Sequence, residues 1–255
     1  MASLLTPQET LGLALAGSIS RTGAKVTTRT LNQAAGVAEG LLLAPSGTAG
    51  QECISPSTEA LVKAAIGFSV IRPMSEDFDS THHYADNEAV ALMESGHMNV
   101  LAEGTCVADK PVFARVTSDG ASNTVLGKVR ADSDYPAGGI VLTPTSPVQG
   151  LATYFSLTLS DGTNTEKFTY LSDTSATAAE ISAALVAQID QSANFAATGS
   201  STISITSTSG IVEVLDKTDT LVISTPARAF RVPGTFFDHS RTGAGLVEIR
   251  REKLN

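Results

Sequence analysis

Residues 89–130 read AVALMESGHMNVLAEGTCVADKPVFARVTSDGASNTVLGKVR, and this stretch decides the fold. It holds short apolar segments that recur about every ten residues, at 89–93, 98–101, 111–116 and 127–130. Turn-forming residues separate these segments: Gly96, Gly104 and Asp119-Gly120. Short strands with turns at such spacing are typical of a barrel or a sandwich. We therefore predict a mainly β protein built on a compact barrel-like or sandwich-like domain.

The residues on either side complete this domain. The N-terminal part is rich in small side chains, and we predict an extended arm over residues 1–37. Short apolar runs at 40–44 and 65–71 predict strands, with at most one helical turn near residue 60. At the other end, a Val232-Pro233-Gly234 turn precedes a last strand at 246–249. The β domain is thus predicted to comprise residues 38–139 plus 227–255.

The composition changes over residues 140–226, which lack arginine and set two lysines against eight acidic residues. Roughly a third of this segment is Ser or Thr. Thr177 and Glu180 form a capping-box pattern, and apolar residues follow at helical spacing: Ile181, Leu185 and Ile189. Before this helix, two strand-like runs flank Asp161-Gly162 and predict a hairpin. Two or three more strands are predicted after the helix. We predict an inserted Ser/Thr-rich, acidic α+β subdomain of hairpin, helix and strands.

Charge and cysteine content exclude several classes of partner. The 255 residues carry a formal net charge of −9 and contain no run of five basic residues, so we expect no nucleic-acid binding. No apolar run approaches the roughly 20 residues needed to span a bilayer, so we expect no membrane association. Cys53 and Cys106 match no zinc or redox spacing. We interpret them as reduced, buried thiols.

The polar loop before residue 89 is a candidate metal site. There His82 and His83 stand near Asp79 and Asp86, which supply imidazole and carboxylate ligands. Adjacent histidines point apart in an extended chain, so a plain solvated loop is the favoured alternative. Cys106 with His97 and Asp109 is a conceivable nucleophilic triad, but a buried structural thiol is favoured over it. No cofactor and no catalytic residue are predicted.

Aromatic residues concentrate in one window near the C-terminus, where Phe230, Phe236 and Phe237 surround Arg231. These phenylalanines are predicted to fill the core where the last strand closes the domain. The alternative is an interface between subunits, because aromatic and arginine side chains gather in the buried centres of interfaces. All four residues are therefore interface candidates.

Several segments occur in a characteristic order: 89–93 with Ser95-Gly96, then 108–115, 127–130, 231–236 and 243–248. This ordered set resembles the structural cement (capsid decoration) proteins of tailed bacteriophages. The chain departs from that pattern in two places. Asp109-Lys110 stands where the family commonly has a glycine, and the long segment 140–226 replaces a direct connection between strands.

The resemblance implies a non-enzymatic virion protein that binds the outer surface of the phage head and stabilises contacts between subunits of the major capsid protein. By analogy it also implies a homotrimer, with a homodimer as the alternative. Such a protein is made in the cytoplasm of the host bacterium and ends on the outer face of the capsid. Two other functions stay open from the sequence: a tail or baseplate component, and a metal-dependent glycan hydrolase that would use the His82-His83 loop.

Overall fold

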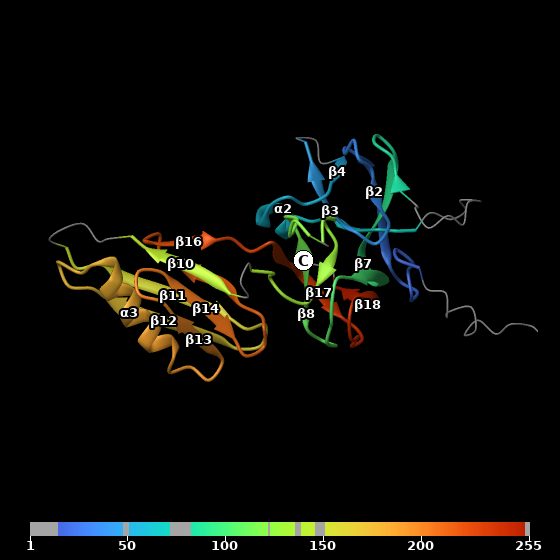
Figure 1. Cartoon of the computed structure of the whole chain (residues 1–255). Coiled ribbons are helices and arrows are strands. Elements are labelled where there is room, and N and C mark those ends of the chain that lie inside the picture. Colours follow the sequence, from blue (N-terminus) through green and yellow to red (C-terminus); the bar gives the residue numbers. More distant parts are fainter. Residues whose placement is uncertain are drawn as a thin grey trace, which may run out of the picture. The chain divides into compact units, whose positions relative to one another are not determined.

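The computed structural model describes residues 15–47, 51–71, 83–121, 123–135, 139–145 and 151–252. The protein is mainly β, as predicted, with 46% of the described residues in strands and 8% in helices. It divides into two compact units (Figure 1). We call Met1–Ala131 with Ala229–Asn255 the body, and Asp132–Arg228 the inserted unit.

In its described residues, the body contains a nine-stranded sheet, a two-stranded sheet and a short helix. The helix is α2 (Glu59–Lys63), which begins at the N-cap Thr58. The strands are β1 (Lys25–Leu31), β2 (Val37–Ala38), β3 (Leu42–Ser46), β4 (Glu52–Ile54), β5 (Gly67–Ser69), β6 (His83–Tyr84), β7 (Ala89–Ala102), β8 (Pro111–Arg115), β9 (Val129–Arg130), β17 (Ala229–Phe237) and β18 (Gly245–Arg251). β2 pairs with β6, and all other strands of the body belong to the large sheet.

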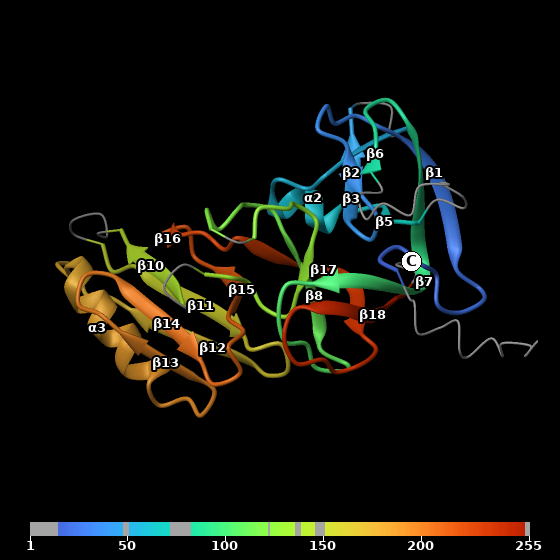
Figure 2. The same ribbon diagram turned by 45° about the vertical axis from the view of Figure 1, so that its right-hand side comes forward.

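Strand β7 organises the large sheet because it belongs to two closed sets of pairings. One set runs β7-β18-β17-β8-β9 and returns to β7, which closes a five-stranded barrel. The other runs β1-β4-β3-β5-β7 and returns to β1. The N-terminal half of β7 pairs with β1 and β5, and its C-terminal half pairs with β18. Figure 2 shows β7 running through the body beside both groups of strands.

Among the described residues of the body, two hydrophobic clusters form its core. The larger contains the inward-facing residues of the C-terminal half of β7, with those of β8, β17 and β18, among them Met98, Val112, Phe237 and Ile249. The smaller contains Leu31, Leu43, Cys53 and Leu92, from the strands of the other ring. Leu42 belongs to the larger cluster, so neighbouring residues of β3 contribute to different clusters. Successive side chains of β3 point to opposite faces of the strand, so β3 contributes to both clusters.

The predicted turn at Ser95-Gly96 is wrong, because β7 runs without a break from Ala89 to Ala102. Gly96 adopts a φ of 125°, which only glycine takes up easily, and it lies where β7 changes partners. The predicted Val232-Pro233-Gly234 turn is also wrong. Those residues lie within β17, at a shift in its register with β8 between Arg231 and Phe236. Both positions are irregularities inside strands, which resemble turns in sequence.

The N-terminal part contributes directly to the sheet. β1 pairs antiparallel with β7 over six residue pairs, from Lys25 opposite Ser95 to Thr30 opposite Ala89. Ile19 forms an isolated bridge with Met98, so residues around it lie against β7 on the edge opposite β18. Residues 15–37 of the predicted arm therefore include a strand and a bridge of the body.

The inserted unit is an α+β structure, and the part of it that the structure describes has two sheets and one helix. One sheet has the order β13-β14-β10-β16, and the other has the order β12-β11-β15. The elements are β10 (Ile140–Pro144), β11 (Tyr154–Ser160), β12 (Thr165–Leu171), α3 (Ala178–Ile189), β13 (Phe195–Thr198), β14 (Ile203–Ser207), β15 (Glu213–Lys217) and β16 (Leu221–Thr225).

The local predictions for the inserted unit are confirmed. β11 and β12 form the hairpin around Asp161-Gly162. The capping box of α3 is complete, since Thr177 Oγ1 accepts from the amide of Glu180 and the Glu180 carboxylate accepts from the amide of Thr177. Ile181, Leu185 and Ile189 of α3 are fully buried in the core of this unit.

Cys53 and Cys106 are both buried and are not joined in a disulfide, as predicted. Burial raises the pKa of the Cys53 thiol to about 11, so this residue stays protonated at neutral pH. Among the described residues, no helix is long and apolar enough to cross a membrane.

Candidate functional site

The outward face of three neighbouring segments of the body carries a connected set of charged side chains. The segment around Ile19 lies on one edge of β7, and β18 lies on the other. In the β7–β18 ladder, His97 stands opposite Arg250 and Asn99 stands opposite Glu248. Side chains alternate along a strand, so these residues point away from the buried Met98 and Ile249. The ladder thus brings polar groups from distant parts of the chain to one face.

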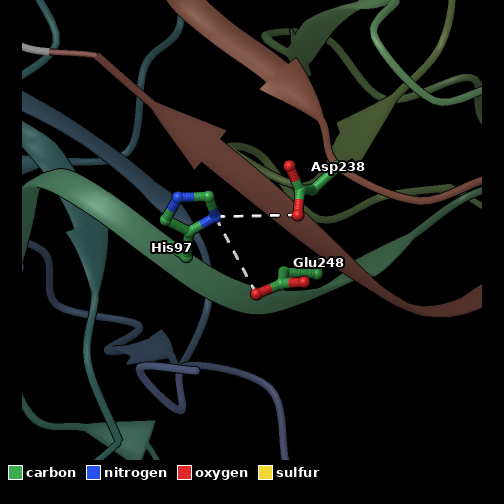
Figure 3. A group of neighbouring side chains, drawn as sticks. All are labelled: His97, Asp238 and Glu248. Atoms are coloured by element: carbon green, nitrogen blue, oxygen red, sulfur yellow. Dashed lines mark ion pairs between the residues drawn. The ribbon is translucent and has the colours of Figure 1, made fainter. Parts of the chain in front are cut away.

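His97, Asp238 and Glu248 form the centre of this face, which we call the charged cluster. His97 Nδ1 lies 3.7 Å from Asp238 Oδ2 and 3.9 Å from Glu248 Oε1. Figure 3 shows the imidazole directed toward both carboxylates. Asp238 directly follows β17, and its amide donates to the carbonyl of Glu248 at 2.9 Å. The hairpin backbone therefore fixes the separation of the two carboxyl groups.

Groups around the charged cluster supply hydrogen bonds and positive charge. Arg21 Nη2 pairs with Asp238 Oδ2 and lies 3.1 Å from Glu248 Oε2. The hydroxyl of Ser20 donates to Glu248 Oε1, and His239 Nδ1 lies 3.1 Å from Glu248 Oε2. Arg250 Nη1 lies 3.5 Å from Asp238 Oδ1. Positive side chains therefore approach the two carboxylates from the N-terminal segment and from the hairpin.

The carboxyl groups are partly withdrawn from water, with side-chain exposures of 11% for Asp238 and 12% for Glu248. Burial alone would raise the pKa of Glu248, but the hydrogen bonds from Ser20 and Arg21 outweigh it and lower that pKa. The hydrogen bond to Glu248 in turn raises the pKa of Arg21. Glu248 and Arg21 are therefore both ionised at neutral pH. The nitrogen His97 Nδ1 is buried and has no hydrogen-bond partner among the described residues.

Arg115 and Glu103 form a second charged group, in the interior of the body. Arg115 is fully buried, and its Nε and Nη2 donate to the two oxygens of Glu103, each at 2.7 Å. Arg115 Nη1 also donates to the carbonyl of Thr117 at 2.9 Å. Arg130 Nη1 lies 3.3 Å from the same Glu103 carboxylate. This bidentate pair links β8 to the segment that follows β7, and its burial indicates a structural role.

Another buried arginine lies at the end of β18. Arg251 Nη2 donates to the carbonyl of Ala65 at 2.7 Å, and its guanidinium lies 5.9 Å from the ring centre of Phe68. Burial lowers the pKa of Arg251 to about 10, which still leaves it charged at neutral pH. The contacts attach the last strand to the segment after α2.

The loop named as a candidate metal site is only partly within the described residues. Asp79 and His82 lie outside them, and His83 belongs to β6 without a described side chain. Asp86 has another role, because its Oδ1 accepts from the amide of Gln33 at 2.8 Å and its Oδ2 accepts from Asn87. The loop as a metal site therefore stays a prediction.

The Cys106 triad is not assembled. Asp109 is exposed and its charged contact is Arg250, at 3.6 Å. The Cys106 backbone forms a bridge with Arg241, and the Cys106 thiol lies 3.4 Å from the carbonyl of Gly104. His97 faces the carboxylates of the charged cluster instead. This placement agrees with the interpretation of Cys106 as a buried structural thiol.

The interface candidates on β17 differ in exposure. Phe237 is fully buried in the larger cluster of the body, so its side chain presents no surface to a partner. Phe230 packs against that cluster and remains partly exposed. Phe236 is also partly exposed, with the guanidinium of Arg250 at 5.7 Å from its ring centre. Arg231 is partly exposed as well.

Sequence reasoning missed Asp238 and Glu248, and it considered His97 only with Cys106. The one available signal was alternation: His97 and Glu248 are polar residues between apolar neighbours in strands. Alternation indicates which face a residue occupies, but not which strand lies beside it. The pairing of β7 with β18 supplies that missing information.

One comparison with known families identifies a match over nearly the whole chain. A family model described as "Structural cement protein (E217 gp24/Pam3 gp6)" matches residues 6–252. The match spans both the body and the inserted unit. No curated protein matches the chain.

Proposed function

Because the chain belongs to the structural cement protein family of bacteriophages, with a structural role at the phage capsid, we propose that it binds the outer surface of the head and stabilises contacts between major capsid protein subunits. The family match over residues 6–252 is the observation that supports this proposal. We further propose that the role is non-enzymatic.

Capsid association makes physical demands that the described structure can meet. A protein that strengthens a shell must bury surface on two neighbouring subunits at once, and stable interfaces bury on the order of 1,200–2,000 Å² in total. The free-energy cost of ordering its own chain on binding must also be small. The body offers closed strand pairings, two hydrophobic clusters and a buried bidentate ion pair. These features supply a preorganised surface.

We propose that Phe230, Arg231 and Phe236 of β17 contribute to contacts with the capsid or with another copy of the chain. Their side chains combine apolar area with charge and are partly exposed in the single chain. Aromatic and arginine residues with such partial exposure commonly supply much of the energy of an interface. We propose a homotrimer as the assembled form, with the homodimer as the alternative that a mass measurement of the purified protein would distinguish.

The experiment uses expanded heads of the matching phage from which the protein is absent. Added protein is expected to co-sediment with these heads and to raise the temperature at which they rupture. Protein that neither sediments with the heads nor changes their rupture temperature would refute the proposed function.

Variants then test the proposed contact residues. Phe230→Ala and Phe236→Ala are each expected to weaken head binding about tenfold, which corresponds to about 1.4 kcal/mol. Tyr154→Ala is the matched control, because it removes an aromatic ring that is 51% exposed on the inserted unit. All variants should first show the thermal unfolding of a folded protein. Equal weakening by the control and the β17 variants would contradict the assignment to β17.

A further inference from the structure

We propose that His97, Asp238 and Glu248 form a binding site for a divalent transition-metal ion of the Zn²⁺ type. One ligand atom from each residue lies within 4.8 Å of the other two. The set combines an imidazole nitrogen with two carboxylate oxygens, all of which are accepted ligands of such ions. This inference concerns a site on the body and does not depend on the proposed capsid function.

The absence of a hydrogen bond to His97 Nδ1 among the described residues is the observation that favours an ion over a simple ion-pair network. Arg21 already contacts both carboxylates, and Ser20 donates to one of them. These contacts leave His97 Nδ1 buried and without a hydrogen bond among the described residues, although it faces both carboxylates (Figure 3). Buried polar atoms are rarely left without a partner. A cation between the three groups would be a partner for all of them at once.

The separations fit coordination better than they fit direct hydrogen bonds. His97 Nδ1 is 3.7 and 3.9 Å from the two carboxylate oxygens, beyond the range of an N–H···O bond. Zinc binds nitrogen and oxygen at about 2.0–2.2 Å, so tetrahedral ligands lie about 3.3–3.6 Å from one another. Small rotations of the side chains would bring the three atoms to that spacing. Imidazole also disfavours Mg²⁺ and Ca²⁺, which select oxygen ligands.

Two neighbours would respond to the ion in opposite ways. The Arg21 guanidinium carries a positive charge on the same carboxylates and would compete with the ion. His239 Nδ1 lies 3.1 Å from Glu248 Oε2 and 3.8 Å from Asp238 Oδ2, so it is a candidate fourth ligand. Arg21 is 49% exposed, so its side chain can move into solvent when an ion binds.

A bound ion would link elements that are distant in sequence. His97 belongs to β7, Glu248 belongs to β18, and Asp238 lies between β17 and β18. An ion bound only by the folded arrangement stabilises it by mass action. The ion would therefore hold the C-terminal hairpin against the long strand.

The test measures Zn²⁺ binding to the full chain by isothermal titration calorimetry, with Co²⁺ absorption as a signature of the ligand set. We expect one Zn²⁺ per chain, little response to Mg²⁺, and a rise in unfolding temperature with Zn²⁺. His97→Gln should weaken Zn²⁺ binding at least about 100-fold and alter the Co²⁺ spectrum. Arg21→Ala should tighten Zn²⁺ binding, because it removes the competing charge.

The matched control is the double variant His82→Ala/His83→Ala, which removes histidines from the other candidate loop. It should bind Zn²⁺ as the unaltered chain does. Glu248→Gln provides an independent test if His97→Gln fails to fold, and it should also lose the ion. The proposal is overturned if the unaltered chain binds no Zn²⁺, if binding survives both cluster variants, or if the His82/His83 variant abolishes it.

Discussion

At the scale of single residues, the pair Arg115 and Glu103 shows how this body tolerates charge in its interior. Arg115 has no exposed side-chain surface, and Glu103 has 3%. Two parallel hydrogen bonds of 2.7 Å satisfy the guanidinium and the carboxylate together. Moving either charge from water into the interior is costly, so each depends on the other.

Glu103→Gln is therefore expected to lower the free energy of unfolding by about 3–5 kcal/mol, because it replaces the buried carboxylate that accepts two hydrogen bonds from Arg115. Chemical denaturation followed by far-UV circular dichroism measures this loss. Glu252→Gln is the control, since Glu252 pairs with Arg250 at 3.6 Å and is 59% exposed. It should change stability by no more than about 0.5 kcal/mol. Similar losses in both variants would contradict the structural role given to the buried pair.

At the scale of elements, Gly96 determines whether β7 can remain one strand. Its φ of 125° is unfavourable for any residue with a side chain. A Cβ at this position would also lie 2.8 Å from Cα and Cβ of Ala24. The glycine thus permits both the local backbone conformation and the close approach of the segment before β1.

Gly96→Ala should destabilise the protein by about 1–3 kcal/mol, through backbone strain and the clash with Ala24. Thermal unfolding monitored by circular dichroism gives the change. Gly104→Ala is a matched glycine-to-alanine control, because a Cβ at Gly104 meets no atom within 4 Å. If the two substitutions had equal effects, the special role of Gly96 would be wrong.

The elements also show which parts of the fold are predictable from sequence. Helix α3 is predictable because its capping box and apolar spacing are local signals within thirteen residues, Thr177–Ile189. The hairpin of β11 and β12 is predictable for the same reason. The continuity of β7 is not, because a glycine at a bend and a glycine in a turn look alike in sequence.

The charged cluster could not be predicted from the sequence, for a related reason. His97 and Glu248 come together because β18 pairs with the C-terminal half of β7. The whole inserted unit lies between these two strands in the sequence. Strand alternation places each residue on an outward face without naming the neighbouring strand. The interface candidates on β17 were visible as an aromatic cluster, yet only the core packing separates the buried Phe237 from the partly exposed Phe230 and Phe236.

At the scale of the whole molecule, the inserted unit leaves and rejoins the body at nearby points. Val129 of β9 and Phe230 of β17 both pair with Ala114, so these strands flank β8 on opposite sides. Two strand spacings amount to about 10 Å. Within the described ranges, every strand of the large sheet pairs only within that sheet. The inserted unit has its own hydrophobic cluster.

Replacing residues 132–228 with a linker of about six residues, mostly glycine and serine, should therefore leave a folded body, because such a linker spans the gap. A cooperative thermal transition and dispersed NMR amide signals would show this. A deletion extended to residue 237 is the control, since it removes β17 from the barrel and should abolish folding. Loss of cooperative unfolding in the shorter deletion would show that the body needs the inserted unit.

The sharing of β7 between two closed sets of strands has a mechanical consequence. Tension that enters through β1 or β5 can pass along the covalent backbone of a single 14-residue strand and leave through β18. Because the neighbouring strands lie alongside β7, a pull along its axis loads many hydrogen bonds in shear together rather than opening them one after another. The two rings should therefore transmit a stretching force as one stiff piece, without a hinge of side-chain contacts between them.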